Sequence, residues 1–282
     1  MIDYLDNLGI IDRTQVSEYY PRVRDRDDIK VMRCNKSGVI FLNKIDLPDY
    51  TTADPHPGTF SSGKNRADIW VEFLSEYLEG KNYADIGAGS GDTILGVAHI
   101  ANRAVAVEAK AKLRAHIMAK LRPNVAVCEH SSDLKDFDYH VITMIHLLEH
   151  LEQPVEELKL LKTKLVPGGH LFVEVPHARD FLFNRLDIEE FKAFTFWSEH
   201  LMLHTKDSLR IMFEAAGFTN IDIRGAQRYP LANHLYWLRY GKPGGQKHWD
   251  DLNSDKLAQI YELHLDTIDQ TDTLVAWGIN DG

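Results

Sequence analysis

Three closely spaced glycines give this chain its clearest chemical signal. The segment from Tyr83 to Asp92 is Tyr-Ala-Asp-Ile-Gly-Ala-Gly-Ser-Gly-Asp, so that Gly87, Gly89 and Gly91 alternate with small residues. Glycine lets a backbone turn tightly and approach a ligand, because it has no Cβ. We therefore predict that a short buried strand ends at a ligand-binding turn, and that a helix follows the turn.

Two acidic residues accompany this turn. Asp85 lies at the strand end, and Glu108 ends the next predicted strand, where an acid can accept both hydroxyls of a ribose. A nicotinamide-dinucleotide site needs G-x-G-x-x-G, but Asp92 occupies the position of the third glycine. A carboxylate at that helix start would face a pyrophosphate, which is electrostatically unfavourable. The pattern favours a ligand with a positive or zwitterionic part.

The glycine turn and its two acids resemble the S-adenosylmethionine (SAM) site of the class I methyltransferases. The resemblance implies SAM as the methyl donor and S-adenosylhomocysteine as the product. It also implies a set of residues around SAM, with Ser131 near the adenine: Asp85, Gly87, Gly89, Gly91, Glu108, Ser131 and Met144.

Three histidines are the candidates for catalysis. Residues 139–151 resemble the family segment in which a hydrophobic strand precedes E/H-x-L-E-H, and His146 falls just past that strand. His177 follows the fifth predicted strand, and His200 lies in a segment that resembles the loop before the last large helix. Histidine is the usual base for a hydroxyl or an amine. Histidines at one edge could also bind a metal ion, but no spacing within one element requires it, and we predict none.

The rest of the chain predicts an α/β fold. From residue 83 onward, strands and helices alternate, which indicates a parallel sheet with helices on both faces. The resemblance implies a Rossmann-like, seven-stranded sheet whose last strand is antiparallel. We place the SAM-binding domain at 65–282, with an inserted lid at 230–270 that covers the substrate.

Residues 1–64 are predicted to form a small β-ribbon and a loop, 48–64, that crosses to the main domain. A hairpin is expected within 29–42. Similar ribbons precede some sugar and polyketide methyltransferases, where a C-x-x-C pair holds zinc. Here Ser37 stands where the second cysteine would be, three residues after Cys34. Zinc needs about four ligands, so we predict a ribbon without metal.

Composition restricts the partners. A net charge of −10 argues against nucleic acid, since phosphate binding needs clustered Lys and Arg. No apolar run approaches the roughly 18 residues of a membrane span, and the start lacks the features of a signal peptide. Cys34 and Cys128 are too few for a disulfide framework. We expect a cytoplasmic protein without nucleic-acid or membrane partners. The sequence leaves open whether the protein forms a homodimer.

The expected activity is methyl transfer to a hydroxyl of a sugar, nucleotide-sugar or glycan precursor. The ribbon suggests a sugar, and so do four lid aromatics that could stack on a sugar face, Tyr236, Trp237, Tyr240 and Trp249. Lid packing is the other explanation of these aromatics. N- or C-methylation of another small metabolite stays an alternative, as does a non-catalytic SAM-binding partner of another enzyme.

Overall fold

The computed structural model describes residues 1–50, 52–54 and 64–282. Residues 51 and 55–63, which belong to the crossing loop predicted at 48–64, lie outside the described residues. No helix among those described is long and apolar enough to cross a bilayer.

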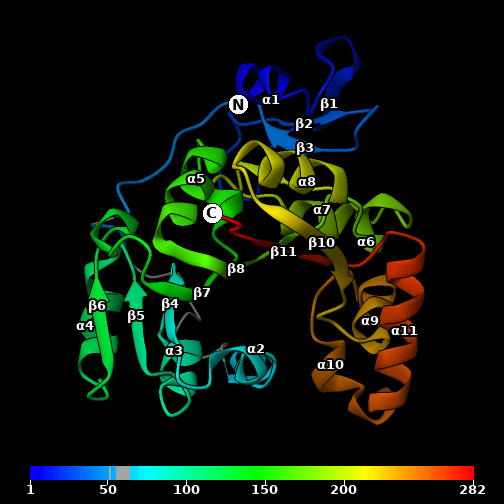
Figure 1. Cartoon of the computed structure of the whole chain (residues 1–282). Helices are drawn as coiled ribbons and strands as arrows, with labels where there is room; N and C mark the ends of the chain where they lie inside the picture. The colour runs from blue at the N-terminus through cyan, green and yellow to red at the C-terminus, as the bar shows by residue number, and fades with distance from the viewer. Residues whose placement is uncertain (51, 55–63) are drawn as a thin grey trace.

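A seven-stranded sheet forms the centre of the molecule (Figure 1). Its order is β10-β11-β8-β7-β4-β5-β6. The strands are β4 (Asn82–Ile86), β5 (Arg103–Val107), β6 (Val125–Cys128), β7 (Tyr139–Ile145), β8 (Leu165–Pro176), β10 (Thr219–Ala226) and β11 (Thr273–Ile279). β11 is antiparallel to both of its neighbours, and the pairs from β8 to β6 are parallel. The predicted Rossmann-like sheet with an antiparallel last strand is confirmed.

The strand order reverses between β4 and β7. The chain runs outward from β4 through β5 to β6, and then returns to β7 and β8 on the other side of β4. Ile86 pairs with Met144 at the carboxyl ends of these two strands. In open α/β sheets, ligands bind at this point of reversal. The topology therefore brings the glycine turn and the residues that follow β7 to one crevice.

Helices cover both faces of the sheet (Figure 1). One face carries α2 (Lys64–Leu78), α3 (Asp92–Val97) and α4 (Ala111–Met118), through Trp70, Leu74, Ile94 and Ile117. The other carries α5 (Pro154–Lys164) and α8 (Lys206–Ala215), through residues such as Leu158, Leu161 and Phe213. Local signals set the helix starts: Pro154 is the first residue of α5, and the Thr205 hydroxyl accepts from the Ser208 amide at the start of α8.

The ribbon is a four-stranded antiparallel sheet above this layer. Its order is β1 (Val16–Tyr20), β2 (Val31–Cys34), β3 (Ile40–Leu42) and β9 (Met202–Leu203). The hairpin expected within 29–42 is present as β2 and β3. The fourth strand, however, belongs to the main domain and follows residue 200. The ribbon is therefore completed by a segment that is far from residues 1–64 in sequence. A shared apolar cluster, including Ile29, Phe183 and Leu203, joins the two parts.

The insertion between β10 and β11 is helical. It contains α9 (Leu231–Tyr240), α10 (Gly245–His248) and α11 (Asp255–Thr267), which lie together beyond the edge of the sheet (Figure 1). Shorter helices complete the chain: α1 (Ile2–Asn7), α6 (Phe181–Asn184), α7 (Glu189–Thr195), η1 (Arg13–Gln15), η2 (Ser131–Asp133), η3 (Leu148–His150) and η4 (Asp250–Leu252).

Candidate functional site

The glycine turn borders a cavity of about 510 Å³ at the carboxyl edge of the sheet. Gly87, Gly89 and Gly91 have φ angles of 72°, 57° and 80°, which L-residues with side chains rarely adopt. Gly87 and Gly89 line the cavity. A Cβ added to Gly89 would meet no atom closer than 4.0 Å, so that any side chain there would enter open space.

Glu108 holds this turn in place. Its Oε2 accepts from the Gly89 amide at 2.8 Å, and its Oε1 accepts from the Lys110 amide at 2.8 Å. Burial raises the pKa of Glu108, and these two hydrogen bonds partly offset that rise. The carboxylate lines the cavity beside the glycine turn, and Ser131 lines it after β6. The structure therefore brings Gly87, Gly89, Glu108 and Ser131 together as expected.

Three other residues expected around the cavity lie behind its wall. Asp85 is buried and accepts from the Thr143 hydroxyl at 2.8 Å, and burial raises its pKa to about 7. Gly91 is the N-cap of α3, where an added Cβ would lie 2.8 Å from Cγ1 of Ile117. Met144 is fully buried in the core. None of the three lines the cavity. Asp85 and Met144 are strand residues, and strand side chains alternate between faces, so a strand end supplies only some of them to the crevice.

His146 lies between this cavity and a second one. The second cavity is about 300 Å³ and also has His146 in its wall. His146 follows β7 with φ 51°, and its amide donates to the Glu174 carbonyl at 2.8 Å. A left-handed backbone at a non-glycine residue is uncommon and is found often at functional sites. Of the three candidate histidines, only His146 faces both cavities.

Two buried carboxylates flank the His146 ring. Nδ1 is 3.0 Å from Oε1 of Glu149, and Nε2 is 3.4 Å from Oε1 of Glu174. Burial acts to raise the pKa of Glu149, but the hydrogen bond with His146 is the largest of the contacts that hold it at about 2. Burial also acts against ionisation of Glu174, yet His146 and Arg66 keep the pKa of that carboxyl well below its usual range. Both groups are therefore carboxylates at neutral pH.

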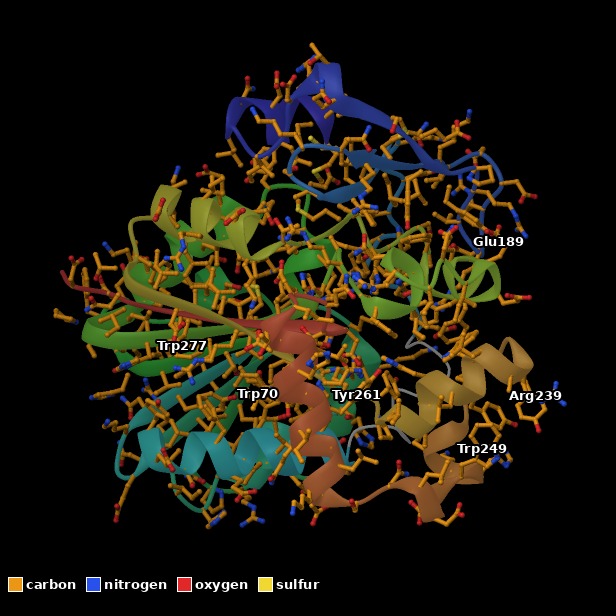
Figure 2. All side chains as sticks on the ribbon, turned by 90° about the vertical axis from the view of Figure 1, so that its right-hand side faces the viewer. Trp70, Glu189, Arg239, Trp249, Tyr261 and Trp277 are labelled. Atoms are coloured by element: carbon orange, nitrogen blue, oxygen red, sulfur yellow. The ribbon has the colours of Figure 1, made fainter. Side chains whose placement is uncertain are left out.

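Helix α2 fixes the second carboxylate. Glu174 forms an ion pair with Arg66, and its Oε2 accepts from the Trp70 indole at 2.5 Å. Trp70 lies where α2 packs below the sheet (Figure 2). These contacts orient Glu174 toward His146.

The other two candidate histidines have different surroundings. His200 lines the second cavity, where its ring centroid is 4.9 Å from that of His150. Burial lowers the pKa of His200 well below its ordinary value. His177 lines neither cavity. Its Nδ1 is 2.9 Å from the Thr271 carbonyl, and burial lowers its pKa to about 4. The structure therefore does not bring His177 into the site, because its ring turns toward the start of β11.

One group of side chains could hold a metal ion. Glu149, His150 and His200 each offer a donor atom, and these atoms lie within 4.8 Å of one another. Cys34 of the ribbon is not part of this group. The arrangement would supply three protein ligands beside His146.

A family model described as a methyltransferase domain matches residues 63–223. The chain belongs to the class I SAM-dependent methyltransferases. A ubiquinone biosynthesis O-methyltransferase of Aeromonas salmonicida is 27% identical over 178 residues, which are 59% of this chain and 74% of that protein.

Solved structures share the fold of this methyltransferase. One chain of a complex that contains the Trm112 methyltransferase activator of Haloferax volcanii has a TM-score of 0.56 at 13% identity, and the match covers 84% of this chain and 100% of that chain. A SAM-dependent methyltransferase of Thermotoga maritima, described as a possible histamine N-methyltransferase, has a TM-score of 0.50 at 16% identity, over 76% of this chain and 89% of that chain.

The larger cavity of the methyltransferase fits SAM. Gly89 leaves open space where a side chain would stand, and Glu108 presents a carboxylate beside it, where ribose hydroxyls can be bound. Asp92, at the start of α3, accepts from the Ser90 hydroxyl at 2.7 Å and gives that helix start a negative charge. We call this space the cofactor cavity and the 300 Å³ space the acceptor cavity.

The lid contributes fewer aromatics to the acceptor cavity than its sequence predicts. Of the four candidates, only Trp237 lines it. The rings of Tyr240 and Trp249 lie 4.6 Å and 5.1 Å from that of Tyr236, so these three pack against one another. In Figure 2, Trp249 lies in the lid, farther from the sheet than Tyr261 of α11. Packing within the lid explains three of the four.

Sequence reasoning missed several residues of this methyltransferase. Glu174 is a charged residue inside an apolar strand, and that contrast was a usable signal. Tyr50 lines the cofactor cavity, whereas Arg24 and Arg228 line the acceptor cavity. These three come from the ribbon, the crossing loop and the β10–α9 connection, so no local pattern marked them.

Proposed function

We propose that this methyltransferase transfers a methyl group to a hydroxyl of a small acceptor, with His146 as the general base. The observation that supports this most directly is the position of His146 in the walls of both cavities. When bound, SAM supplies an electrophilic methyl carbon: its bond to sulfur breaks as a bond to the acceptor oxygen forms, and S-adenosylhomocysteine leaves. The base must stand where donor and acceptor meet.

The partners of His146 suit a base. Nδ1–H donates to Glu149 at 3.0 Å, whereas Nε2 lies 3.1 Å from Nη1 of Arg228, a group that can only donate. These partners assign the proton to Nδ1 and leave the lone pair on Nε2. Nε2 takes the proton of the acceptor hydroxyl as the new bond forms. The resulting imidazolium has Glu149 at one nitrogen and Glu174 at the other, so that both carboxylates stabilise it.

The relative from Aeromonas salmonicida also supports an oxygen acceptor, because its name is that of an O-methyltransferase. A sugar hydroxyl has less support, since three of the four lid aromatics that could stack on a sugar pack among themselves. N- or C-methylation and a non-catalytic SAM-binding role are the competing proposals.

Labelled SAM, offered with a panel of catechols, phenols, nucleotide-sugars and amines, tests the proposal. We expect the label on oxygen, located by NMR of the product. His146→Asn keeps a residue that tolerates a left-handed backbone and should lower kcat about 100-fold or more, with SAM affinity little changed. The exposed His99→Ala is the control. Product labelled on nitrogen or carbon, or an unaltered rate in His146→Asn, would count against the proposal, and SAM binding without turnover would favour the non-catalytic role.

A further inference from the structure

Two arginines face the acceptor cavity without a carboxylate partner. Arg24 reaches it from the ribbon and Arg228 from the β10–α9 connection. Across the described part of the chain, no carboxylate oxygen lies within the 4.0 Å of an ion pair from either guanidinium. The chain carries a net charge of −10, so acids that could pair with arginine are abundant. Two guanidinium groups without a direct carboxylate partner therefore face one small cavity, where their N–H groups can bind an anion.

Aromatic faces hold Arg24. Its Cζ lies 4.6 Å from the ring centroid of Trp197 and 5.9 Å from that of Phe194, and its Nη1 donates to the Phe194 carbonyl at 3.2 Å. Stacking orients a guanidinium while leaving most of its N–H groups available. The position suits an anion that offers two or more acceptor oxygens, such as a carboxylate or a phosphate.

Arg228 contacts the base directly. Its Nη1 is 3.1 Å from Nε2 of His146, on the nitrogen whose lone pair must accept the acceptor proton. Its backbone amide donates to the Asp272 carboxylate, which fixes the main chain, and its side chain is exposed. While the guanidinium donates to Nε2, that lone pair is occupied. Something must draw Arg228 away before the base can act.

The two acids that line the cavity, Asp180 and Asp272, do not draw Arg228 away from His146. Asp272 is occupied by the Arg228 and Tyr229 amides and the Gln227 side chain. Asp180 accepts from the Leu182 amide, and burial raises its pKa well above its ordinary value. Asp272 attracts Arg228 through its charge, but neither acid forms an ion pair with a guanidinium, so the N–H groups of both arginines are left for a ligand.

We propose that the acceptor carries an anionic group, a carboxylate or a phosphate, on a flat body, and that this group binds Arg24 and draws Arg228 away from His146. The rings of Phe191, Phe194 and Trp237 pack against one another and form one aromatic wall of the cavity, on which a flat body can stack. Binding of the correct acceptor thereby frees Nε2 for the proton of its hydroxyl. The inference rests on the proposed function and adds the charge of the substrate to it.

Binding to the enzyme saturated with S-adenosylhomocysteine tests the charge without any turnover. Calorimetry would compare 4-hydroxybenzoate and 4-hydroxyphenyl phosphate with the neutral 4-hydroxybenzamide. We expect at least one anion to bind about tenfold tighter than the amide, as charge-assisted bonds imply. Arg24→Gln and Arg228→Gln should each remove most of that preference. Arg239→Gln, on the lid outside both cavities, should retain it. The two anions separate a carboxylate site from a phosphate site.

The displacement of Arg228 has its own readout. NMR of the labelled His146 ring, assigned with His146→Asn, should shift on addition of the anion in the wild type and already be shifted in Arg228→Gln. Equal affinity for anions and amide, including no binding by any of them, would overturn the inference, as would a preference that survives both arginine substitutions. O-methylation of neutral acceptors with no preference for anions would overturn it and leave the proposed function standing. Anion binding without methyl transfer to any hydroxyl would count against the proposed function instead.

Discussion

Nδ1 of His146 lies 3.0 Å from Oε1 of Glu149, a carboxylate with no exposed surface. The two residues are three apart: His146 directly follows β7, and Glu149 lies within η3. This contact fixes the ring orientation and the tautomer of His146, so that the other nitrogen faces the acceptor. Glu149 is thus a positioning residue that acts through His146.

Glu149→Gln should lower kcat about tenfold to 100-fold, because a neutral amide stabilises an imidazolium less than a carboxylate does. SAM affinity should stay within about threefold of wild type. The loss should shrink for acceptors with more acidic hydroxyls, which need the base less, and a purely structural role would not produce that trend. Steady-state kinetics with phenols of graded acidity measure it. Glu152→Gln, at an exposed site nearby, is the control, and an equal loss for all phenols would contradict the assignment.

Gly89→Val should weaken SAM binding about tenfold to 100-fold, because its side chain would enter the cofactor cavity. The positive φ adds a backbone cost of about 1–2 kcal/mol to folding. Gly80→Val separates the two effects, since Gly80 has φ +67° and open space around it but lies outside both cavities. Urea unfolding should show similar losses of stability in Gly89→Val and Gly80→Val. Calorimetry with SAM should show weaker binding in Gly89→Val alone. Equal SAM affinity in both would remove the turn from the cofactor site.

Asp85→Asn should flatten the pH dependence of stability. The folded pKa of about 7 lies above the ordinary value of 3.8, so the folded protein binds more protons than the unfolded chain between these values. Wild-type stability therefore falls as pH rises from about 4 to 7, by at most about 4 kcal/mol from this group. Urea unfolding at several pH values should show a shallower fall in Asp85→Asn, and the exposed Asp68→Asn is the control. Parallel curves for wild type and Asp85→Asn would show that Asp85 does not titrate in this range.

The purified enzyme should contain no stoichiometric zinc in its ribbon, because Ser37 replaces a cysteine and Cys34 has no second thiol beside it. Elemental analysis measures the metal content. If zinc is found, Cys34→Ser and His200→Ala distinguish the ribbon from the cluster of Glu149, His150 and His200. A full equivalent that is lost in Cys34→Ser alone would show that the ribbon does hold zinc.

The sequence alone determined the strands of the central sheet, the glycine turn and Glu108. These follow from local patterns: the glycines need positive φ angles within a few residues, and buried parallel strands need short apolar runs. The antiparallel position of β11 in the sheet was expected only from the family resemblance, because no local pattern near residues 273–279 specifies which strands they pair with.

Only the tertiary structure decided which polar residues meet. His146 and His177 both follow a strand, yet one ring faces two cavities and the other turns to Thr271. Arg228 reaches His146 across 82 positions of sequence. The direction of a side chain depends on strand register, on the backbone angles at that residue and on packing with distant segments. A local sequence motif specifies none of these. The sequence located the crevice, and the fold selected the groups that fill it.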